Sequence, residues 1–591
     1  MSRILDRYQD QLLLSLKGAG AFQLYAPASD RAVWGEIGDS VRAALIRGAD
    51  HWLTKPIPPI TLDHYLDYAQ RGDQSAFLAA YNARRQSLRA LVMGTCAELT
   101  DRYIAEIARL IWAICEESTW IIPSNNALLP GENLLPDPAE PLIDAYAART
   151  AADLAMAVQL IGEQLDIFSP RLAERIEQEV TRRIIVPFST LEEWLVGPRA
   201  DAIACLAGCM VAFLSFEWED RRRWQCMRRA WRALSNQLDL LAPDGGVRGG
   251  LSAWQEIAGA LVDCLTAVYY ATDGEIDALS DPQVVRLCRF PVAAHLGRGY
   301  FQNPGEQPMR AKIRGMEAYR LGMASRDAHL CDLGAYLIKT GGGDLSTDDV
   351  PLVRRAFEAL HRRKIDQEPL DQPLIRQAFL PDTQYFLARE ENGSEGGLTV
   401  AMHGGDNGSP GGHLDVGDFA LFAGGEPVLV DAGYIQHTEY HNLPTVGRFG
   451  QLYSGEHGAS DIECRLEADF AMMSLDIAGA YPADAGIDIW QRTLILTRGG
   501  GVQLIELFDL REAQEVSFHF LCAQEPSLGD DYAQIGALRI RWDANLTGQV
   551  EKLALREGTG WDALYRIILT TERAVAGGKY NFSMKEIRTY G

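Results

Sequence analysis

The sequence lacks the features that would tie it to a membrane or to an oxidising compartment. No apolar run approaches the ~20 residues of a membrane-spanning helix. The N-terminus carries scattered charges where a secretory leader has an apolar core. The ten cysteines are dispersed and form no CxxC pair, as expected for buried thiols in a reducing compartment. These absences predict a cytoplasmic protein with no membrane partner.

Positive charge is scarce as well. Lysine and arginine number 56 against 80 aspartates and glutamates, so the net charge is −24. A general nucleic-acid binder needs a basic surface, and this balance argues against one. The glycine run at 341–343 lacks the Lys-Ser/Thr of a phosphate loop, and no nucleophile elbow is visible. The 591 residues suffice for two or three domains with full cores.

The first part of the chain, residues 1–375, has the pattern of helices. Apolar residues recur at spacings of three and four, and Pro- and Gly-rich breaks separate such segments. The clearest runs are Ile104, Ile107, Leu110, Ile111 and Ile114; Leu154, Val158, Ile161 and Leu165; and Ile257, Leu261, Leu265 and Val268. Many helices with short breaks predict an array of antiparallel helix pairs, which can close into a ring.

The second part, residues 376–591, has the pattern of short strands. Phe419, Leu421 and Ala423 occupy alternate positions, and turn signals recur every eight to twelve residues. Similar alternation flanks a predicted turn at Arg498–Gly501. Little helix is evident here, which predicts a stacked antiparallel β-sandwich. The predicted fold class is therefore α+β multidomain, with a helical domain over 1–375 and a sandwich domain over 376–591.

Histidines are few but concentrated. Five of the eleven lie between positions 403 and 457, far more than even spacing would place there: His403, His413, His437, His441 and His457. Neutral imidazole and carboxylate are the usual ligands of a zinc ion, so the cluster predicts a metal site. The alternative is that these histidines form hydrogen bonds within the loops.

Several motifs occur in a fixed order along the chain. They are Tyr81-Asn82-Ala83-Arg84-Arg85, Glu117-Ser118-Thr119-Trp120, Leu135-Pro136-Asp137, Leu380-Pro381-Asp382-Thr383-Gln384, the histidine loop, His441-Asn442-Leu443-Pro444-Thr445, and Ala478-Gly479-Ala480-Tyr481-Pro482. In this order they resemble the heparinase II/III-like family of polysaccharide lyases over almost the whole chain. The resemblance implies an N-terminal α/α toroid followed by a C-terminal antiparallel β-sandwich, with a cleft between them for an acidic polysaccharide.

The resemblance also implies a reaction and a metal. The reaction is β-elimination, in which a base removes the proton beside a uronate carboxyl group and an acid protonates the leaving glycosidic oxygen. The metal is a structural zinc ion whose ligands map onto His413, Asp431 and His441. His413 and Asp431 stand 18 positions apart, and a hairpin between them would bring the two ends together. A fourth ligand could be water or His437.

The match fails at the residues that the family uses for catalysis. The family loop has the form His-x-His-x-Asp, and its first histidine is replaced here by Gly411, which has no side chain to carry a proton. The family's tyrosine aligns with Ala253, and its Asn-rich helix start aligns with Trp194–Cys205, which contains no asparagine. Two outcomes stay open: the chemistry was rebuilt with other groups, or binding was kept without catalysis.

Three residues are predicted as catalytic substitutes. His437 and Tyr440 lie in the loop that follows Asp431, and Tyr440 can serve as an acid or base if a cation lowers its pKa. Arg248 can pair with a carboxylate through two parallel donors. The alternatives are that Tyr440 is a packing residue and that Arg248 is an ordinary loop residue.

Five residues are predicted to bind substrate. Asn125 and Asn126, beside a proline, can hold a sugar carboxylate or hydroxyl, and Trp254 and Trp120 can stack on a sugar ring. Arg448 completes the set. The alternatives are ordinary loop residues for the asparagines and core aromatics for the tryptophans.

The sequence therefore predicts a zinc-containing lyase that acts by β-elimination on a uronate-containing oligosaccharide or another small acidic molecule. Two other functions stay open. One is a catalytically inactive carbohydrate-binding relative, and the other is a metal-dependent eliminase or hydrolase on a non-polymeric substrate. No nucleic-acid partner is expected, and a homodimer is one oligomeric state that the sequence allows.

Overall fold

The apolar spacing in the first part of the chain forms helices, as predicted. In the computed structural model the three apolar runs lie in α6 (Ile104–Cys115), α8 (Ala145–Phe168) and α13 (Gly250–Ala271). The five isoleucines and leucines of α6 are all buried. Helix α8 begins at Asp144, whose carboxylate accepts a hydrogen bond from the Ala147 backbone N–H at 2.7 Å and so caps the helix.

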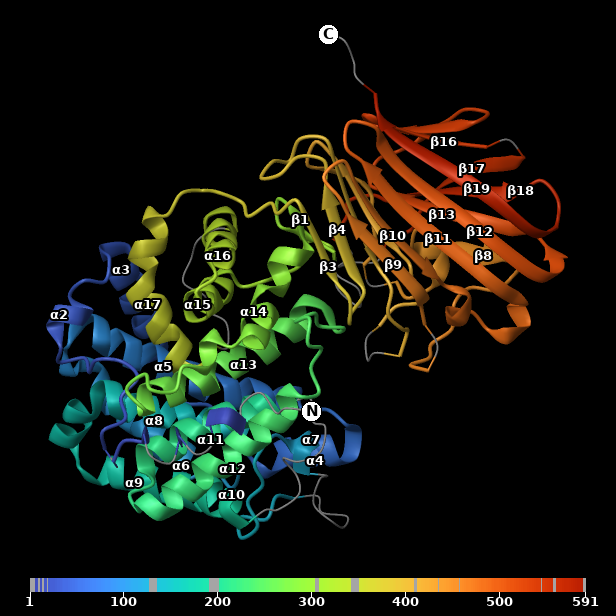
Figure 1. The fold of residues 1–591 in the computed structure, drawn as a ribbon. Helices are drawn as coiled ribbons and strands as arrows, with labels where there is room; N and C mark the ends of the chain where they lie inside the picture. The colour runs from blue at the N-terminus through green and yellow to red at the C-terminus, as the bar shows by residue number, and fades with distance from the viewer. Residues whose placement is uncertain are drawn as a thin grey trace. The chain divides into compact units, whose positions relative to one another are not determined.

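The described chain divides into two compact units that interleave in sequence (Figure 1). The structure describes residues 6–8, 11–12, 15–18, 20–126, 135–190, 201–302, 308–341, 350–408, 412–433, 435–456, 458–543, 545–555 and 560–587. The helical unit comprises Met1–Leu241, Glu256–Asp281 and Ile338–Pro369, and the sheet unit comprises Ala242–Gln255, Pro282–Leu337 and Leu370–Gly591. Among the described helices, none is long and apolar enough to cross a membrane.

The helical unit is built from helices that pack on one another, in several cases across an intervening helix in the sequence. Helix α11 packs on α8 and α12, and α3 packs on α5. Besides α6, α8 and part of α13, the helices are α2 (Arg31–Trp34), α3 (Asp39–Leu53), α4 (Leu62–Arg71), α5 (Ser75–Glu98), α7 (Pro123–Asn126), α9 (Arg171–Val180), a π-helix (Thr181–Ile185), α10 (Val186–Thr190), α11 (Ala202–Phe216), α12 (Asp220–Leu238) and α17 (Leu352–Gln367).

Buried charge holds the centre of this unit together. Both oxygens of Glu117 accept hydrogen bonds from the Arg85 guanidinium at 2.6 Å, and Arg84 donates to the same carboxylate at 3.0 Å. The hydroxyl of Tyr81 donates to the Trp120 carbonyl at 2.9 Å. Two of the sequence motifs thus meet in the core, where they join α5 to the segment after α6.

The sheet unit contains two antiparallel sheets and three further helices, α14 (Pro282–Ala294), α15 (Gly315–Ser325) and α16 (Ala328–Thr340), the last of which extends into the helical unit. The eight-stranded sheet has the order β14 (Ser527–Leu528), β15 (Tyr532–Ile535), β16 (Leu538–Trp542), β19 (Val575–Glu586), β12 (Gly501–Gln514), β11 (Ile487–Thr497), β10 (Phe470–Asp476) and β9 (Ser460–Leu466). The nine-stranded sheet has the order β17 (Leu546–Lys552), β18 (Tyr565–Thr571), β13 (Val516–Cys522), β7 (Glu426–Leu429), β6 (Phe419–Ala423), β5 (Leu398–His403), β4 (Tyr385–Arg389) and β3 (Gln377–Leu380), and β8 (Pro444–Val446) pairs with β13. A short hairpin, β1 (His295–Gly297) with β2 (Tyr300–Phe301), forms a separate two-stranded sheet.

The two sheets share one hydrophobic core, as expected when two inner faces pack on each other. This core takes buried side chains from strands of both sheets, among them Phe419 and Leu421 of β6 and Leu494 and Leu496 of β11. The Phe419, Leu421 and Ala423 alternation predicted from the sequence therefore faces this core, and the predicted turn at 498–501 joins β11 to β12.

An Asp-Gly-Gly turn at 244–246 lies just before α13, in a segment that belongs to the sheet unit. One oxygen of Asp244 accepts hydrogen bonds from the backbone N–H groups of Asp382 and Thr383, at 2.7 and 2.8 Å. Glycine is needed at positions 245 and 246 because of the backbone conformation and the close approach of Thr383. A Cβ at Gly246 would lie 1.9 Å from the Thr383 hydroxyl oxygen, and Gly245 has a φ of 84°. The turn thus packs directly on the connection between β3 and β4.

Candidate metal centre

The candidate site lies in the loops that join strands of the nine-stranded sheet. Residues 404–418 connect β5 to β6, and β6 and β7 form the predicted hairpin, which turns at Gly424 and Gly425. Both glycines have a positive φ, of 58° and 78°. Asp431 follows β7, and a 3₁₀ turn (Thr438–Tyr440) then leads to His441 just before β8.

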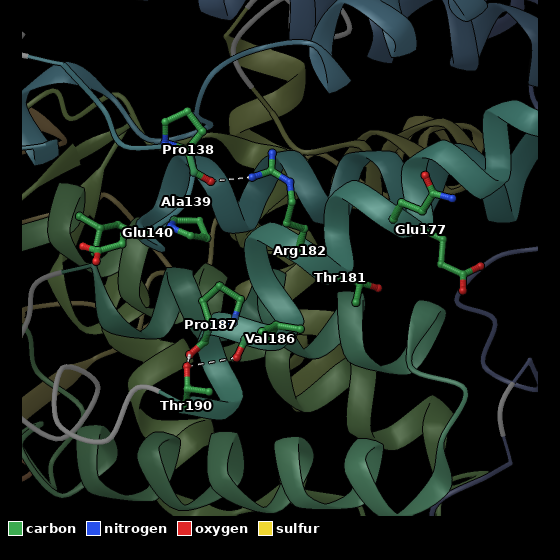
Figure 2. A pocket seen from close by; sticks show the side chains of 12 residues that line it. Pro138, Ala139, Glu140, Glu177, Thr181, Arg182, Val186, Pro187 and Thr190 are labelled. Atoms are coloured by element: carbon green, nitrogen blue, oxygen red, sulfur yellow. Dashed lines mark hydrogen bonds between the residues drawn. The ribbon is translucent and has the colours of Figure 1, made fainter.

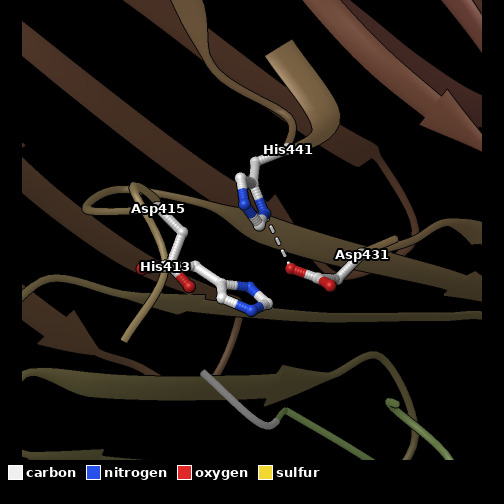
Figure 3. A group of neighbouring side chains, drawn as sticks. All are labelled: His413, Asp415, Asp431 and His441. Carbon is white, nitrogen blue, oxygen red and sulfur yellow. Dashed lines mark hydrogen bonds and ion pairs between the residues drawn. The ribbon is translucent and has the colours of Figure 1, made fainter. Parts of the chain in front are cut away.

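Four side chains converge at the base of these loops (Figure 3). His413, Asp415, Asp431 and His441 each bring one nitrogen or oxygen within 4.8 Å of the others. All four are buried, with exposed fractions between 0 and 8%. The Nδ1 atom of His441 lies 2.8 Å from Oδ2 of Asp431. The three residues that the sequence predicted as ligands are therefore together, and Asp415 joins them.

The donor set fits a divalent cation. A tetrahedral ion with ligands at about 2.1 Å separates its ligand atoms by about 3.4 Å, so modest side-chain movements close the present spacing. Within the described residues, Nε2 of His441 and Oδ2 of Asp415 are buried and have no hydrogen-bond partner. Burying such atoms unsatisfied costs free energy, and a bound cation would satisfy both. The cluster can therefore hold a metal ion.

The electrostatics of the cluster favour positive charge at its centre. Burial disfavours the ionised form of Asp415, but His403, His441 and His413 outweigh this effect and hold its pKa well below the usual range. Burial opposes protonation of His441, yet Asp431 reverses the effect and raises its pKa to about 9. Burial, and then the charge of Asp431, raise the pKa of Asp418 to about 7. Three carboxyl groups thus crowd one buried volume, which a cation would neutralise.

A second layer of polar residues orients these groups. Gln302 lies with its amide nitrogen 2.8 Å from Nδ1 of His403, and Nε2 of the same ring lies 3.4 Å from Asp415. The backbone N–H of Asn442 donates to Asp418 at 2.7 Å. The Asn442 amide nitrogen donates to the carbonyl of Val430, the residue before Asp431, at 3.1 Å. Such outer contacts fix the orientation of metal-binding side chains.

The predicted catalytic residues near the cluster differ in their accessibility. His437 is exposed, and Tyr440 is half-buried beneath the Arg566 guanidinium, whose carbon lies 5.1 Å from the ring centroid. Arg448 is exposed and lies against Phe449. His437 and Tyr440 are thus on the same short loop as His441, and a cation other than the proposed metal already faces Tyr440.

Arg248 lies in the sheet unit, beside the loop after β5. Its guanidinium pairs with Asp406, and 56% of the Arg248 side chain is exposed. The sequence placed Arg248 opposite a substrate carboxylate, and the structure gives it a carboxylate from its own chain. A ligand that used Arg248 would have to share or displace Asp406.

The remaining predicted substrate residues lie within the fold. Asn125 donates to Asp144 at 2.8 Å, and Asn126 is buried. Trp120 and Trp254 are 1% and 0% exposed. Their indole N–H groups donate to the carbonyls of Ile114 and Leu287, respectively. A sugar can stack only on an exposed ring, so both tryptophans are core residues in this structure.

The helical unit carries a separate surface pocket of about 900 Å³ (Figure 2). It lies between the segment 138–142 and the helices α9 and α10, and Arg182 reaches across to the Pro138 carbonyl at 2.8 Å. Its wall is mostly apolar and contains no aromatic side chain among the described residues. Asn125, Asn126 and Trp120 do not line it.

Sequence reasoning missed part of the site. Asp415 stands two residues after His413, in the His-x-Asp segment, and this spacing was the available signal for a fourth candidate ligand. His403 and Asp418 border the same buried volume from the ends of β5 and β6. Two other predictions, on Gly411 and on most of Trp194–Cys205, concern positions outside the described residues, as does His457.

Comparison with known proteins bears on the fold. No family model matches the sequence, and no curated protein matches it significantly. Solved structures do match. A structure of heparinase III aligns with a TM-score of 0.62 at 11% identity, over 98% of this chain and 89% of its own. Heparan sulfate lyase from Pedobacter heparinus aligns with a TM-score of 0.58 at 11% identity, over 95% and 91%. The chain thus has a polysaccharide-lyase-like fold over nearly its whole length.

Proposed function

We propose that this protein is a lyase that cleaves a uronate-containing oligosaccharide, or a related acidic molecule, by β-elimination. The observation that supports it most is the fold. Structures described as heparinase III and heparan sulfate lyase match nearly the whole chain. The buried His/Asp cluster adds to it, because its loops also carry the candidate proton-transfer residues.

The proposed reaction needs three groups. A base takes the proton from the carbon beside the uronate carboxyl group, a cation neutralises that carboxylate, and an acid protonates the leaving oxygen as the C–O bond breaks and a C=C bond forms. His437 is exposed and can take or give a proton at its ring nitrogen. Tyr440, half-buried beside Arg566, supplies a phenolic hydroxyl, and Arg248 supplies an accessible guanidinium.

We further propose that the cluster binds zinc and that the ion holds the loops in place. Zinc would supply positive charge among the buried carboxylates. His413, Asp415, Asp431 and His441 offer four protein ligands, the number of a closed structural site, whereas catalytic zinc sites keep a position open. This count favours a loop-shaping ion over the alternative in which the metal itself acts on a non-polymeric substrate.

The test is a screen of acidic oligosaccharides for the ultraviolet absorbance of the new conjugated double bond. Tyr440→Phe should lower turnover at least a hundredfold if the hydroxyl carries the proton, as general acid–base groups contribute about 10²–10⁴-fold. Tyr453→Phe is the matched control, because Tyr453 is an exposed tyrosine on the neighbouring loop whose hydroxyl contacts the Gly408 backbone. Equal rates for the wild type and Tyr440→Phe would remove Tyr440 from the mechanism.

Binding without turnover is a second candidate function, and one observation favours it. The chain has Gly411 where the family's loop has its first histidine, and a glycine cannot transfer a proton. Calorimetric binding of a uronate oligosaccharide with no absorbance change, for any substrate in the screen, would establish this function instead of the lyase.

A further inference from the structure

A buried ion pair lies in the core between the two sheets, where the strands otherwise point apolar side chains inward. In β11 the inward positions are Trp490, Arg492, Leu494 and Leu496. Glu506 of β12 is the direct cross-strand partner of Arg492, and the two side chains are 0% and 2% exposed. Burying an ion pair carries a desolvation cost that two apolar residues would avoid, so stability alone does not explain the presence of this pair.

The contacts of the pair run in two directions. On one side, Arg492 Nη2 donates to Glu506 at 2.6 Å, and the Trp490 indole donates to the other oxygen of the same carboxylate at 2.8 Å. On the other side, Arg492 Nη1 donates to the carbonyls of Gly417, at 2.8 Å, and Asn442, at 2.6 Å. One guanidinium therefore reaches from the eight-stranded sheet to two loops of the nine-stranded sheet.

These two loops carry different ligands of the candidate metal centre. Gly417 comes two residues after Asp415, and Asn442 directly follows His441. The first loop is also packed closely against Arg492 of β11 and against Ile477, which follows β10. Gly417 has a φ of 88°, and a Cβ there would lie 2.8 Å from Ile477 and 3.6 Å from Arg492. A single nitrogen atom thus ties the Asp415 side of the cluster to the His441 side.

We infer that Arg492 is a positioning residue of the metal centre. Held by Glu506, its guanidinium sets the spacing between the loop of His413 and Asp415 and the loop of His441. The inference rests on the metal centre proposed above and adds to it a support that touches no ligand atom. Loss of outer-shell support typically weakens metal binding by about 10–100-fold, because the ligands no longer meet at the right spacing.

The experiment measures zinc affinity by competition with a chromophoric chelator, on the full chain, together with thermal unfolding. Three variants are compared with the wild type: Glu506→Gln, which keeps the shape but removes the charge, Arg492→Lys, which keeps the charge but cannot make the same set of bonds, and Glu117→Gln. The last is the matched control. Like Glu506→Gln, it replaces the glutamate of a buried arginine–glutamate pair by glutamine, but in the helical unit.

We expect Glu506→Gln and Arg492→Lys to bind zinc about 10–100-fold more weakly than the wild type, and Glu117→Gln to bind it with unchanged affinity. The absorption spectrum of bound Co²⁺ should change in the first two variants and not in the third, which a general loss of stability would not produce. Folded Arg492→Lys protein with wild-type affinity and spectrum would overturn the inference alone. Wild-type protein that binds no zinc would overturn both this inference and the proposed metal centre.

Discussion

Buried charge occurs in both units of this protein, and it is arranged in opposite ways. In the helical unit two guanidinium groups, of Arg84 and Arg85, enclose the carboxylate of Glu117, and both of its oxygens accept hydrogen bonds. In the loops of the sheet unit, three carboxyl groups and three imidazoles crowd together, and among the described residues buried atoms of His441 and Asp415 have no hydrogen-bond partner.

The difference is whether the buried charged groups satisfy one another within the fold or leave polar atoms that a bound ion could satisfy. An arginine–carboxylate network that satisfies itself has no use for an ion. A cluster of buried carboxylates and imidazoles with unsatisfied oxygen and nitrogen atoms gains from one. The motifs Tyr81–Arg85 and Glu117–Trp120 belong to the first kind, because their charged and polar groups satisfy one another in the core.

The largest effect should follow from removing the ion that the loop cluster is proposed to hold. A chelator should lower the thermal stability of zinc-loaded wild type, by about 4 kcal/mol if free zinc had exceeded the dissociation constant a thousandfold. His413→Ala should contain no zinc and should not respond to the chelator. The measurements are metal analysis and thermal unfolding with and without chelator.

Comparing His437 with Asp415 tests which of the two side chains is the fourth ligand of the proposed zinc ion. His437 is on the same loop as His441 but is exposed, and the structure places Asp415, not His437, in the cluster. His437→Ala should therefore keep its zinc, whereas Asp415→Asn should lose much of its affinity. Loss of zinc from His437→Ala, with retention in Asp415→Asn, would reverse this assignment.

The next effect is a loss of stability when the buried network of Arg84, Arg85 and Glu117 is broken. Glu117→Gln leaves two buried guanidinium groups without their carboxylate and should reduce the free energy of unfolding of the helical unit by about 3 kcal/mol. Denaturant unfolding followed by tryptophan fluorescence measures it. Glu116→Gln is the control, because the neighbouring glutamate is 51% exposed and its pair with Arg175 lies at the surface, where the expected loss is below about 1 kcal/mol. Similar losses for the two variants would contradict the comparison.

Much of the fold could be predicted because periodicity reports burial directly. The alternation at Phe419, Leu421 and Ala423 marked an inward strand face, and the hairpin that follows brings His413 and Asp431 together. Three candidate metal ligands were predicted from that geometry and the family resemblance. The helices α6, α8 and α13 were equally visible, since their apolar residues recur on one face.

The rest depended on contacts that spacing does not encode. Whether Asp415 points into the cluster is decided by the loop conformation after His413. A buried tryptophan and an exposed sugar platform look alike in sequence, so Trp254 could not be placed. Arg492 was not identified from the sequence, because its role appears only when the register sets it opposite Glu506 and within hydrogen-bonding distance of two loops.

A smaller effect tests a long-range contact of this kind in the sheet unit. Asp244→Ala removes the acceptor for the backbone N–H groups of Asp382 and Thr383, and the free energy of unfolding should fall by about 2 kcal/mol, since buried donors are left unsatisfied. Thr383→Val removes only the hydroxyl contact to Asp244, at 3.1 Å, and should cost about 1 kcal/mol. Denaturant unfolding of both variants gives the ranking, and the reverse order would show that the turn is not held by Asp244.

The last effect is a pH dependence from a histidine outside the metal loops. His295 is fully buried, its ring nitrogens have no hydrogen-bond partner among the described residues, and burial, with a contribution from Arg389, lowers its pKa to about 3. Below pH 6.5 the unfolded chain takes up a proton that the folded chain refuses. The contribution of His295 to stability is therefore full above that pH and is lost toward pH 3, by about 1.4 kcal/mol per pH unit.

His295→Phe keeps an aromatic ring beside Phe301 and removes the titration. The difference in the free energy of unfolding between wild type and variant, measured at pH 7, 6 and 5, should shift toward the variant as the pH falls. Other histidines titrate in both proteins and cancel in this difference. A difference that stays constant from pH 7 to 5 would contradict this prediction, because it would mean that His295 takes up a proton in the folded protein as readily as in the unfolded chain.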